Sequence, residues 1–146
     1  MLKGIDPLIF PELLFTLSRM GHGDELVIAD RNYPAYSTNR RVHRLDGVDS
    51  TTAARAVFGL LPIDTFTAAP LACMEVVGAP GSIAEVQVDF RAAAVEAAGR
   101  ELVMESLPRE AFYERARAAF AVLATGEERP YGCFIVVKGV LPEFTP

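Results

Sequence analysis

The sequence predicts an α/β fold, in which strands and helices alternate along a chain of 146 residues. Short apolar runs of strand length, at residues 26–29, 71–77 and 134–137, are separated by longer segments whose apolar residues recur at helical spacing. A cluster of glycine and proline at residues 78–82 breaks the chain between two such segments. Alternation of this kind favours a layered architecture, in which ligands usually bind beyond the ends of the strands.

The expected helix limits follow from residues that begin and end helices. Pro11 suits a first helical turn, and Gly99 suits the position directly after a last one. One of the hydroxyl residues at 50–52 is expected to cap the second helix, and Pro62 to end it. The predicted helices cover residues 11–20, 53–61, 83–98 and 110–118, and the predicted strands cover residues 26–29, 41–45, 71–77, 101–106 and 134–137. Residues 120–124 fit either an extension of the last helix or a short strand.

Length and composition favour one domain over residues 1–146, because 51% hydrophobic residues are enough for a substantial core. The net charge is −5 and no block of Lys and Arg follows one element, which argues against nucleic acid as a partner. No apolar stretch approaches the roughly 18 to 20 residues that span a bilayer, and the start lacks the pattern of a secretory leader. We therefore expect a cytoplasmic protein with no membrane partner.

The residue pattern gives no support for a metal or nucleotide site. His22 and His43 stand far apart, without the close spacing that metal-binding histidines usually show. Residues 78–82 lack the Gly-Lys-Ser/Thr ending of a phosphate loop. Cys73 and Cys133 belong to no paired motif, and each is expected to be a reduced, mostly buried thiol. The prediction is a protein without metal or cofactor.

The most informative residue is His22, which lies between two glycines at the end of the first predicted helix. Imidazole exchanges a proton near neutral pH, and the flanking glycines favour an open turn that a ligand can reach. Asp30 directly follows the next predicted strand, where its carboxylate could orient the imidazole or bind a ligand hydroxyl. The alternative is a histidine that only hydrogen-bonds a neighbouring loop. Asp24 and Glu25 are expected to be solvated or to cap the turn.

Two further groups of residues could contact a ligand. Arg109 and Tyr113 are four apart and would share one face of a helix, which offers a guanidinium and a phenol together. The alternative is a surface arginine packed over a half-buried tyrosine. Tyr131, Gly132 and Cys133 precede the final strand, and the glycine would let backbone amides approach a ligand closely.

With these residues assembled, the chain resembles the ribose pyranase and L-fucose mutarotase family, and more closely its fucose branch. The similarity runs over nearly the whole length and rests on several ordered motifs at matching separations. The motifs are Pro11-Glu12-Leu13-Leu14, Met20-Gly21-His22-Gly23-Asp24-Glu25, Ala29-Asp30-Arg31-Asn32-Tyr33-Pro34-Ala35, Phe112-Tyr113-Glu114-Arg115-Ala116, Ala124-Thr125-Gly126-Glu127 and Tyr131-Gly132.

The resemblance implies a single-domain, three-layer α/β/α fold with a central, mostly parallel sheet. It implies a cofactor-free enzyme that interconverts the α and β anomers of a free monosaccharide. It also implies assembly into rings, often decamers, in which neighbouring subunits complete the sites. By the same resemblance, His22 is the proton donor and Tyr131 is a second phenol near the reacting centre. The residues expected to contact the sugar are Asp30, Asp64, Arg109, Tyr113 and Cys133.

One position departs from the family pattern. The fucose branch usually has Tyr-Gly-Asn before the final strand, and here Cys133 takes the place of the asparagine. A thiol donates and accepts hydrogen bonds only weakly. The departure therefore bears on which sugar is bound more than on which type of reaction is catalysed. One alternative function is therefore a non-catalytic sugar-binding or transport-associated regulator. Another is a ribose-type pyranase, although the segment at 32–35 favours the fucose branch.

Overall fold

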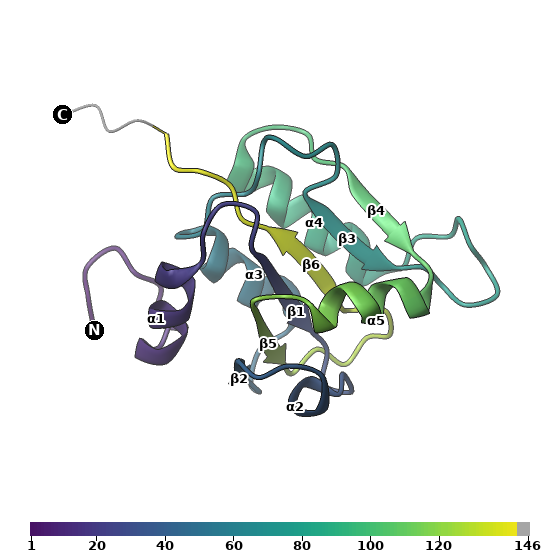
Figure 1. Ribbon diagram of the computed structural model, residues 1–146, viewed down its shortest axis with the longest axis horizontal. Coiled ribbons are helices and arrows are strands. Elements are labelled where there is room, and N and C mark those ends of the chain that lie inside the picture. The colour runs from purple at the N-terminus through teal and green to yellow at the C-terminus, as the bar shows by residue number, and fades with distance from the viewer. Residues whose placement is uncertain (143–146) are drawn as a thin grey trace.

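The computed structural model describes residues 1–142, and Figure 1 shows how their helices and strands are arranged. The strands are β1 (Glu25–Ala29), β2 (Val42–Leu45), β3 (Leu71–Met74), β4 (Met104–Leu107), β5 (Ala121–Thr125) and β6 (Phe134–Val137). The helices are α1 (Pro11–Arg19), α2 (Ala35–Thr38), α3 (Ser50–Phe58), α4 (Glu85–Ala98) and α5 (Arg109–Arg117). Among these helices, none combines the length and the apolar character that crossing a membrane requires.

The strands form one six-stranded sheet in the order β2-β5-β1-β6-β3-β4. β1 pairs in parallel with β5, β5 with β2, and β3 with β4. β6 runs antiparallel to both of its neighbours, β1 and β3. The prediction of a mostly parallel sheet is confirmed. Because β6 runs the other way, it begins beside the end of β1, where Phe134 pairs with Ile28.

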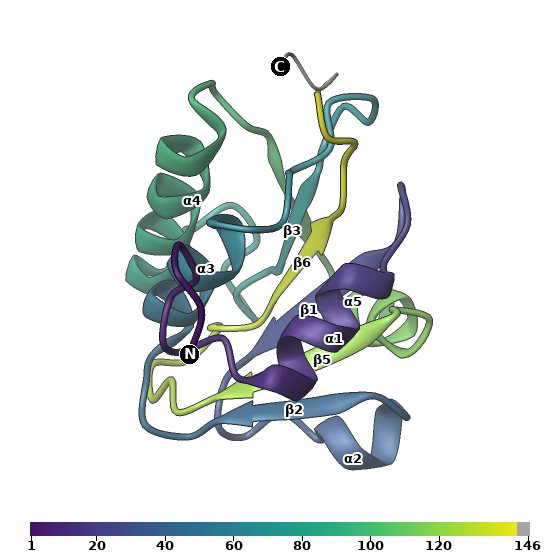
Figure 2. The same ribbon diagram turned by 90° about the vertical axis from the view of Figure 1, so that its left-hand side faces the viewer.

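Helices cover both faces of the sheet, which confirms the three-layer arrangement (Figure 2). In β1, Leu26 and Ile28 belong to the core that the sheet shares with α1, α3 and α4. Val27 and Ala29 belong to the core on the other face, which α2 and α5 cover. Successive side chains of a strand point to opposite faces, so an uninterrupted apolar run fits a strand that is buried on both sides.

The cap of α3 differs from the expectation. The carboxylate of Asp49 accepts the backbone N–H of Thr52 at 2.7 Å, and the helix begins at Ser50. The prediction of a hydroxyl cap at 50–52 was therefore wrong. The Ser50 hydroxyl is engaged elsewhere, because it donates to the carboxylate of Glu127 at 3.0 Å. The helix ends at Phe58, a few residues before the proline that was expected to end it.

Other element limits depend on pairing across the sheet. Residues 121–125 form strand β5 between β1 and β2, which resolves the alternatives left open for this segment. The strand predicted at 71–77 ends at Met74, and the strand predicted at 101–106 is β4, shifted toward the C-terminus. Gly99 has φ 68° directly after α4, as expected for a glycine that ends a helix. The single turn of α2 was not predicted, because four residues carry no detectable periodicity.

The core between α4 and the sheet contains a stacked aromatic pair. Phe90 is fully buried, and its ring lies parallel to that of Phe134 with 3.8 Å between the centroids. We expect Phe90→Ala to lower the free energy of unfolding by about 3 to 5 kcal/mol, because it leaves a cavity at this contact. Val88→Ala is the matched control on the same helix, since Val88 is 55% exposed, and its effect should stay within about 0.5 kcal/mol. Chemical denaturation measures both, and equal losses would contradict the packing described here.

Candidate active site

His22 lies on a turn between α1 and β1 that is fixed on both sides of the residue. The N–H of Gly21 donates to the Asp24 carboxylate at 2.7 Å, and the N–H of Gly23 donates to the carbonyl of Lys138 at 2.9 Å. The left-handed backbone conformation falls at Gly23, with φ 85°, and not at Gly21. The side chain of His22 is 45% exposed, which confirms that its ring lies on an open turn.

The two acidic residues after this turn behave differently. Asp24 caps the turn through its bond to the Gly21 N–H, as one of the two expected roles. Glu25 is not a solvated side chain, because its carboxylate pairs with the Arg115 guanidinium on α5 at 2.9 Å. Arg115 also binds Glu105 on β4, so this half-buried cluster joins the helix to two strands.

The imidazole of His22 contacts a buried carboxylate. Its Nε2 lies 3.0 Å from Oδ1 of Asp64, whose side chain is only 1% exposed. The other oxygen, Oδ2, accepts the backbone N–H of Thr67 at 2.8 Å. Burial raises the pKa of Asp64, but N–H donors from Thr67, Phe66 and His22 outweigh it and bring the pKa to about 2. Asp64 is therefore an ionised acceptor that holds the ring in one orientation.

The sugar contact expected for Asp64 stays a prediction, and in the structure its carboxylate contacts the His22 imidazole. Both of its oxygens are occupied by protein donors, so its direct partner is the imidazole. The exposed ring of Phe66 lies against the same imidazole, with 4.9 Å between the centroids. We call this group of His22, Asp64 and Phe66 the His22 end of the sheet.

Asp30 lies at the opposite end of the sheet. It follows β1, whereas His22 precedes it, and at about 3.3 Å per residue the five-residue strand alone spans roughly 15 Å. The hypothesis that Asp30 orients the His22 imidazole within one chain is therefore wrong. Its carboxylate accepts the N–H of Asn32 at 2.9 Å in a local turn, and the residue is half-buried.

The thiol of Cys133 is directed into the protein rather than toward a ligand. Cys133 is 4% exposed, and its Sγ accepts the backbone N–H of Asp30 at 3.4 Å. Burial, together with the nearby Asp30 charge, raises the pKa of the thiol, so it stays protonated. The expectation that the Cys133 side chain contacts the sugar is not supported by this placement. Its contribution is to join the end of β1 to the start of β6.

Tyr131 adopts a backbone conformation that is unusual for a residue with a side chain. Its φ is 63°, in the left-handed region that costs of order 1 to 3 kcal/mol for such a residue. Its hydroxyl oxygen accepts the backbone N–H of Val77, just beyond β3, at 3.1 Å. Because that bond uses an oxygen lone pair, the phenolic proton stays available to a ligand.

Arg109 and Tyr113 share one face of α5, as predicted. The guanidinium carbon of Arg109 lies 5.6 Å from the centroid of the Tyr113 ring, and Arg109 is exposed while Tyr113 is half-buried. This geometry also matches the simpler alternative of a surface arginine packed over a tyrosine. The ring of Tyr113 also stacks on that of Tyr33, with 5.6 Å between centroids and 8° between the planes. Tyr33 was not singled out from the sequence, although it belongs to a motif that carried the resemblance.

These residues gather where the parallel strands end. Asp30 and Tyr33 follow β1, Arg109 and Tyr113 follow β4, and Tyr131 precedes the antiparallel β6. We call this group the Asp30 end of the sheet. One chain therefore carries the candidate histidine, His22, at one end and the remaining polar candidates at the other. Within residues 1–142, no group of three or more His, Cys, Asp and Glu side chains is arranged to hold a metal ion.

Comparison with known proteins places this arrangement in a family. The sequence profile of the RbsD / FucU transport protein family matches residues 3–141. The chain belongs to this family. Among its relatives, the L-fucose mutarotase of Actinobacillus pleuropneumoniae serotype 5b is 44% identical over 144 residues, which are 97% of this chain and 99% of that protein.

Solved structures of the family have the same fold. The fucose mutarotase from Streptococcus pneumoniae, crystallised in complex with L-fucose, superposes with a TM-score of 0.88 at 39% identity, over 97% of this chain and 100% of that one. FucU from Bifidobacterium longum superposes with a TM-score of 0.89 at 39% identity, over 95% of this chain and 99% of that one.

The lowered pKa of Asp64 predicts how this carboxylate affects stability in acid. A pKa of about 2 in the folded protein, against 3.8 ordinarily, stabilises the fold above pH 3.8, and this stabilisation is lost as the pH falls toward 2. We expect the difference in unfolding free energy between wild type and Asp64→Asn to be largest at neutral pH and to shrink below about pH 4.

Denaturation at several pH values measures this difference. Asp46→Asn, which alters an exposed ion pair with Arg44, is the control and should change stability little throughout. A wild-type advantage over Asp64→Asn that persists undiminished at pH 2.5 would contradict an ionised Asp64.

Proposed function

We propose that this protein is a mutarotase that interconverts the α and β anomers of L-fucose or a related pyranose. The observation that carries the proposal is the exposed His22 imidazole held by the buried, ionised carboxylate of Asp64. Relatives named L-fucose mutarotase, aligned over almost the whole chain, support the same reaction. The structure in complex with L-fucose, from Streptococcus pneumoniae, supports the same sugar class.

The reaction requires only proton transfers. The sugar ring opens when the anomeric hydroxyl loses a proton and the ring oxygen gains one, and it closes again on either face. An ionised Asp64 accepts a hydrogen bond, so Nε2 of His22 carries the proton of that bond. Nδ1 is then the nitrogen that exchanges a proton with the sugar. No cofactor enters these steps.

The Asp30 end supplies groups that suit a sugar. Asp30 offers a carboxylate oxygen to hydroxyls, Tyr131 offers its phenolic proton, and the Arg109–Tyr113 pair offers a guanidinium over an aromatic face. In this proposal Tyr131 is the second proton-transfer group and the others bind the sugar. These roles agree with those that the family resemblance implies.

We further propose that two copies of the chain complete each site. The strand that separates His22 from Asp30 is longer than a monosaccharide, so one copy cannot bring both groups to the same sugar. A homo-oligomer in which the His22 end of one copy meets the Asp30 end of another removes this difficulty. A closed ring is the symmetric arrangement that repeats such a contact without leaving an unpaired end.

The role of His22 can be tested with the second histidine as control. We expect His22→Ala to lower the rate of anomer exchange by roughly 10²- to 10⁴-fold, because it removes the acid–base group. His43→Gln should retain the wild-type rate, since His43 bonds Thr16 at 2.6 Å and packs on Phe10, away from both ends. Exchange between the anomer resonances of L-fucose in NMR spectra measures the rates.

The same measurement separates the proposal from its alternatives. Calorimetry that shows fucose binding, with exchange unaffected by His22→Ala, would support a sugar-binding regulator instead. Faster pyranose–furanose conversion of ribose than anomer exchange of fucose would support a ribose-type pyranase. The buried Cys133 thiol weakens the case for a regulator, because the departure that motivated it lies inside the protein.

Sharing of sites between copies can be tested by complementation. His22→Ala and Asp30→Asn are each expected to be inactive alone, because every site then lacks one group. Mixed oligomers of the two variants should recover about a quarter of the wild-type rate per subunit, since one contact in four pairs two intact ends. Co-expression with two affinity tags isolates the mixed oligomers. Mixed oligomers as inactive as the separate variants would contradict a shared site.

A further inference from the structure

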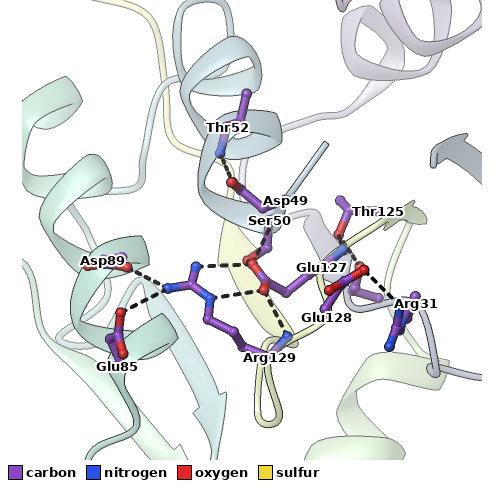
Figure 3. A network of polar contacts seen from close by, with 11 residues as sticks. Arg31, Asp49, Ser50, Thr52, Glu85, Asp89, Thr125, Glu127, Glu128 and Arg129 are labelled. Atoms are coloured by element: carbon purple, nitrogen blue, oxygen red, sulfur yellow. Dashed lines mark hydrogen bonds and ion pairs between the residues drawn. The ribbon is translucent and has the colours of Figure 1, made fainter. Parts of the chain in front are cut away.

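The strongest unexplained feature of the molecule is an ion pair at the Asp30 end, between the buried carboxylate of Glu127 and the partly exposed guanidinium of Arg129. The Glu127 side chain is 2% exposed, and its carboxylate accepts hydrogen bonds from two of the three side-chain nitrogens of Arg129, Nε and Nη2, at 3.0 and 3.2 Å (Figure 3). The same carboxylate accepts the Arg129 backbone N–H at 3.0 Å and the Ser50 N–H and hydroxyl at 3.2 and 3.0 Å. Burial raises the pKa of Glu127, and these donors outweigh it and bring it to about 2.

The pair joins the loop between β5 and β6 to two helices. Ser50 is the first residue of α3, so its bonds hold Glu127 against that helix. On its other side, Nη1 of Arg129 lies 2.7 Å from Asp89 and 3.7 Å from Glu85, both on α4. The loop is thus fixed at its centre from both directions, as Figure 3 shows.

The same loop segment fixes the backbone on both sides of Asp30. The Thr125 hydroxyl donates to the carbonyl of Ala29 at 2.8 Å, and the carbonyl of Glu127 accepts the N–H of Arg31 at 3.2 Å. The Thr125 oxygen also accepts the N–H of Glu127 at 3.2 Å. A shift of Glu127 therefore moves the residues that flank Asp30.

The ion pair also limits the position of Tyr131. Tyr131 lies two residues after Arg129 and directly before Gly132, and its left-handed backbone persists only if its surroundings enforce it. A Cβ atom on Gly132 would lie 2.7 Å from Cγ of Glu127 and 3.2 Å from the Arg129 carbonyl, so the loop is packed directly onto the pair. Gly132, the residue directly after Tyr131, therefore has little room to move unless Glu127 or Arg129 moves too.

We infer that Glu127 and Arg129 form a positioning pair for the proposed reaction, which holds Asp30 and Tyr131 in the geometry that the sugar requires. This inference rests on the proposed function. The Arg129 side chain is 33% exposed, and the cost of burying the Glu127 carboxylate offsets part of the attraction between the charges. A role in geometry therefore explains it better than a role in stability alone. Neither side chain touches the sugar in this proposal.

The test compares two substitutions, each of which replaces the glutamate of a Glu–Arg ion pair by the neutral glutamine. Glu127→Gln keeps the size of the side chain and an oxygen for Ser50, but it removes the charge that holds Arg129. Glu105→Gln is the control, since Glu105 on β4 binds Arg115 on α5 at 2.5 Å and Arg115 binds Glu25 rather than the loop between β5 and β6. Steady-state anomer exchange of L-fucose gives kcat and KM, and thermal unfolding gives the midpoint of each variant.

We expect Glu127→Gln to lower kcat by roughly 10- to 100-fold at temperatures well below its unfolding midpoint, because small displacements of reacting groups cost this much. Glu105→Gln should keep kcat and KM near wild type, even if its unfolding midpoint falls as much as that of Glu127→Gln.

Arg129→Lys retains the positive charge but cannot donate from two nitrogens at once, and its kcat should lie between those of wild type and Glu127→Gln. Arg129→Lys also tests the inference if Glu127→Gln does not fold. Wild-type kcat and KM in both Glu127→Gln and Arg129→Lys, or in a folded Arg129→Lys alone, would overturn the inference.

The failure of the proposed function can be told apart from the failure of this inference. If the wild-type protein does not accelerate anomer exchange, the proposed function fails, and kcat carries no information on the pair. Backbone amide resonances then provide the readout. Shifts at Asp30 and Tyr131 in Glu127→Gln, absent in Glu105→Gln, would support the positioning role, and unchanged resonances would overturn it.

Discussion

Strand β1 separates the two ends of the sheet at which this chain carries its polar groups, and it is buried on both faces. A strand held by neighbours on either side and by helices above and below cannot fold back to bring its ends together. His22 precedes the strand and Asp30 follows it, so any chemistry that needs both depends on contact between copies. The same arrangement leaves the imidazole and the Phe66 ring exposed in one chain, and in the proposed oligomer a second copy covers them.

Two buried carboxylates organise these ends in the same physical way. Asp64 and Glu127 are each almost fully buried, and each is kept ionised by N–H donors that outweigh the cost of burial. Each then fixes something that would otherwise move, which is the imidazole of His22 in one case and the loop that carries Tyr131 in the other. The rigid sheet gives the separation between the ends, and the carboxylates give each end its geometry.

Most of the fold could be predicted from local patterns in the sequence. Apolar runs such as 26–29 and 134–137 gave strands at the expected places, and Gly99 ended a helix as expected. The helix and strand limits that were predicted wrongly depend on contacts with residues far away in the sequence. Residues 121–125 form a strand because they pair with β1 on one side and β2 on the other. Ser50 does not cap α3, and its hydroxyl donates to Glu127 instead.

The site was harder to predict, since its decisive contacts join residues far apart in the chain. His22 and Asp64 are 42 positions apart, and no spacing rule connects them. The resemblance brought Asp64 into the site without its contact to His22, because it carried residue identities and no orientation of the side chains. Glu127 belongs to one motif of the resemblance, but nothing in the local sequence indicated its ion pair with Arg129. That pair depends on the packing of a loop against two helices, which forms only on folding.

Both sulfur atoms of the cysteines lie inside the protein. Cys73 is 3% exposed and Cys133 is 4% exposed, and burial raises the pKa of each thiol. Alkylating reagents and peroxides attack accessible thiolates, so neither cysteine offers them a target while the chain is folded. The proposed chemistry uses only nitrogen and oxygen groups, and it should proceed equally well under oxidising and reducing conditions.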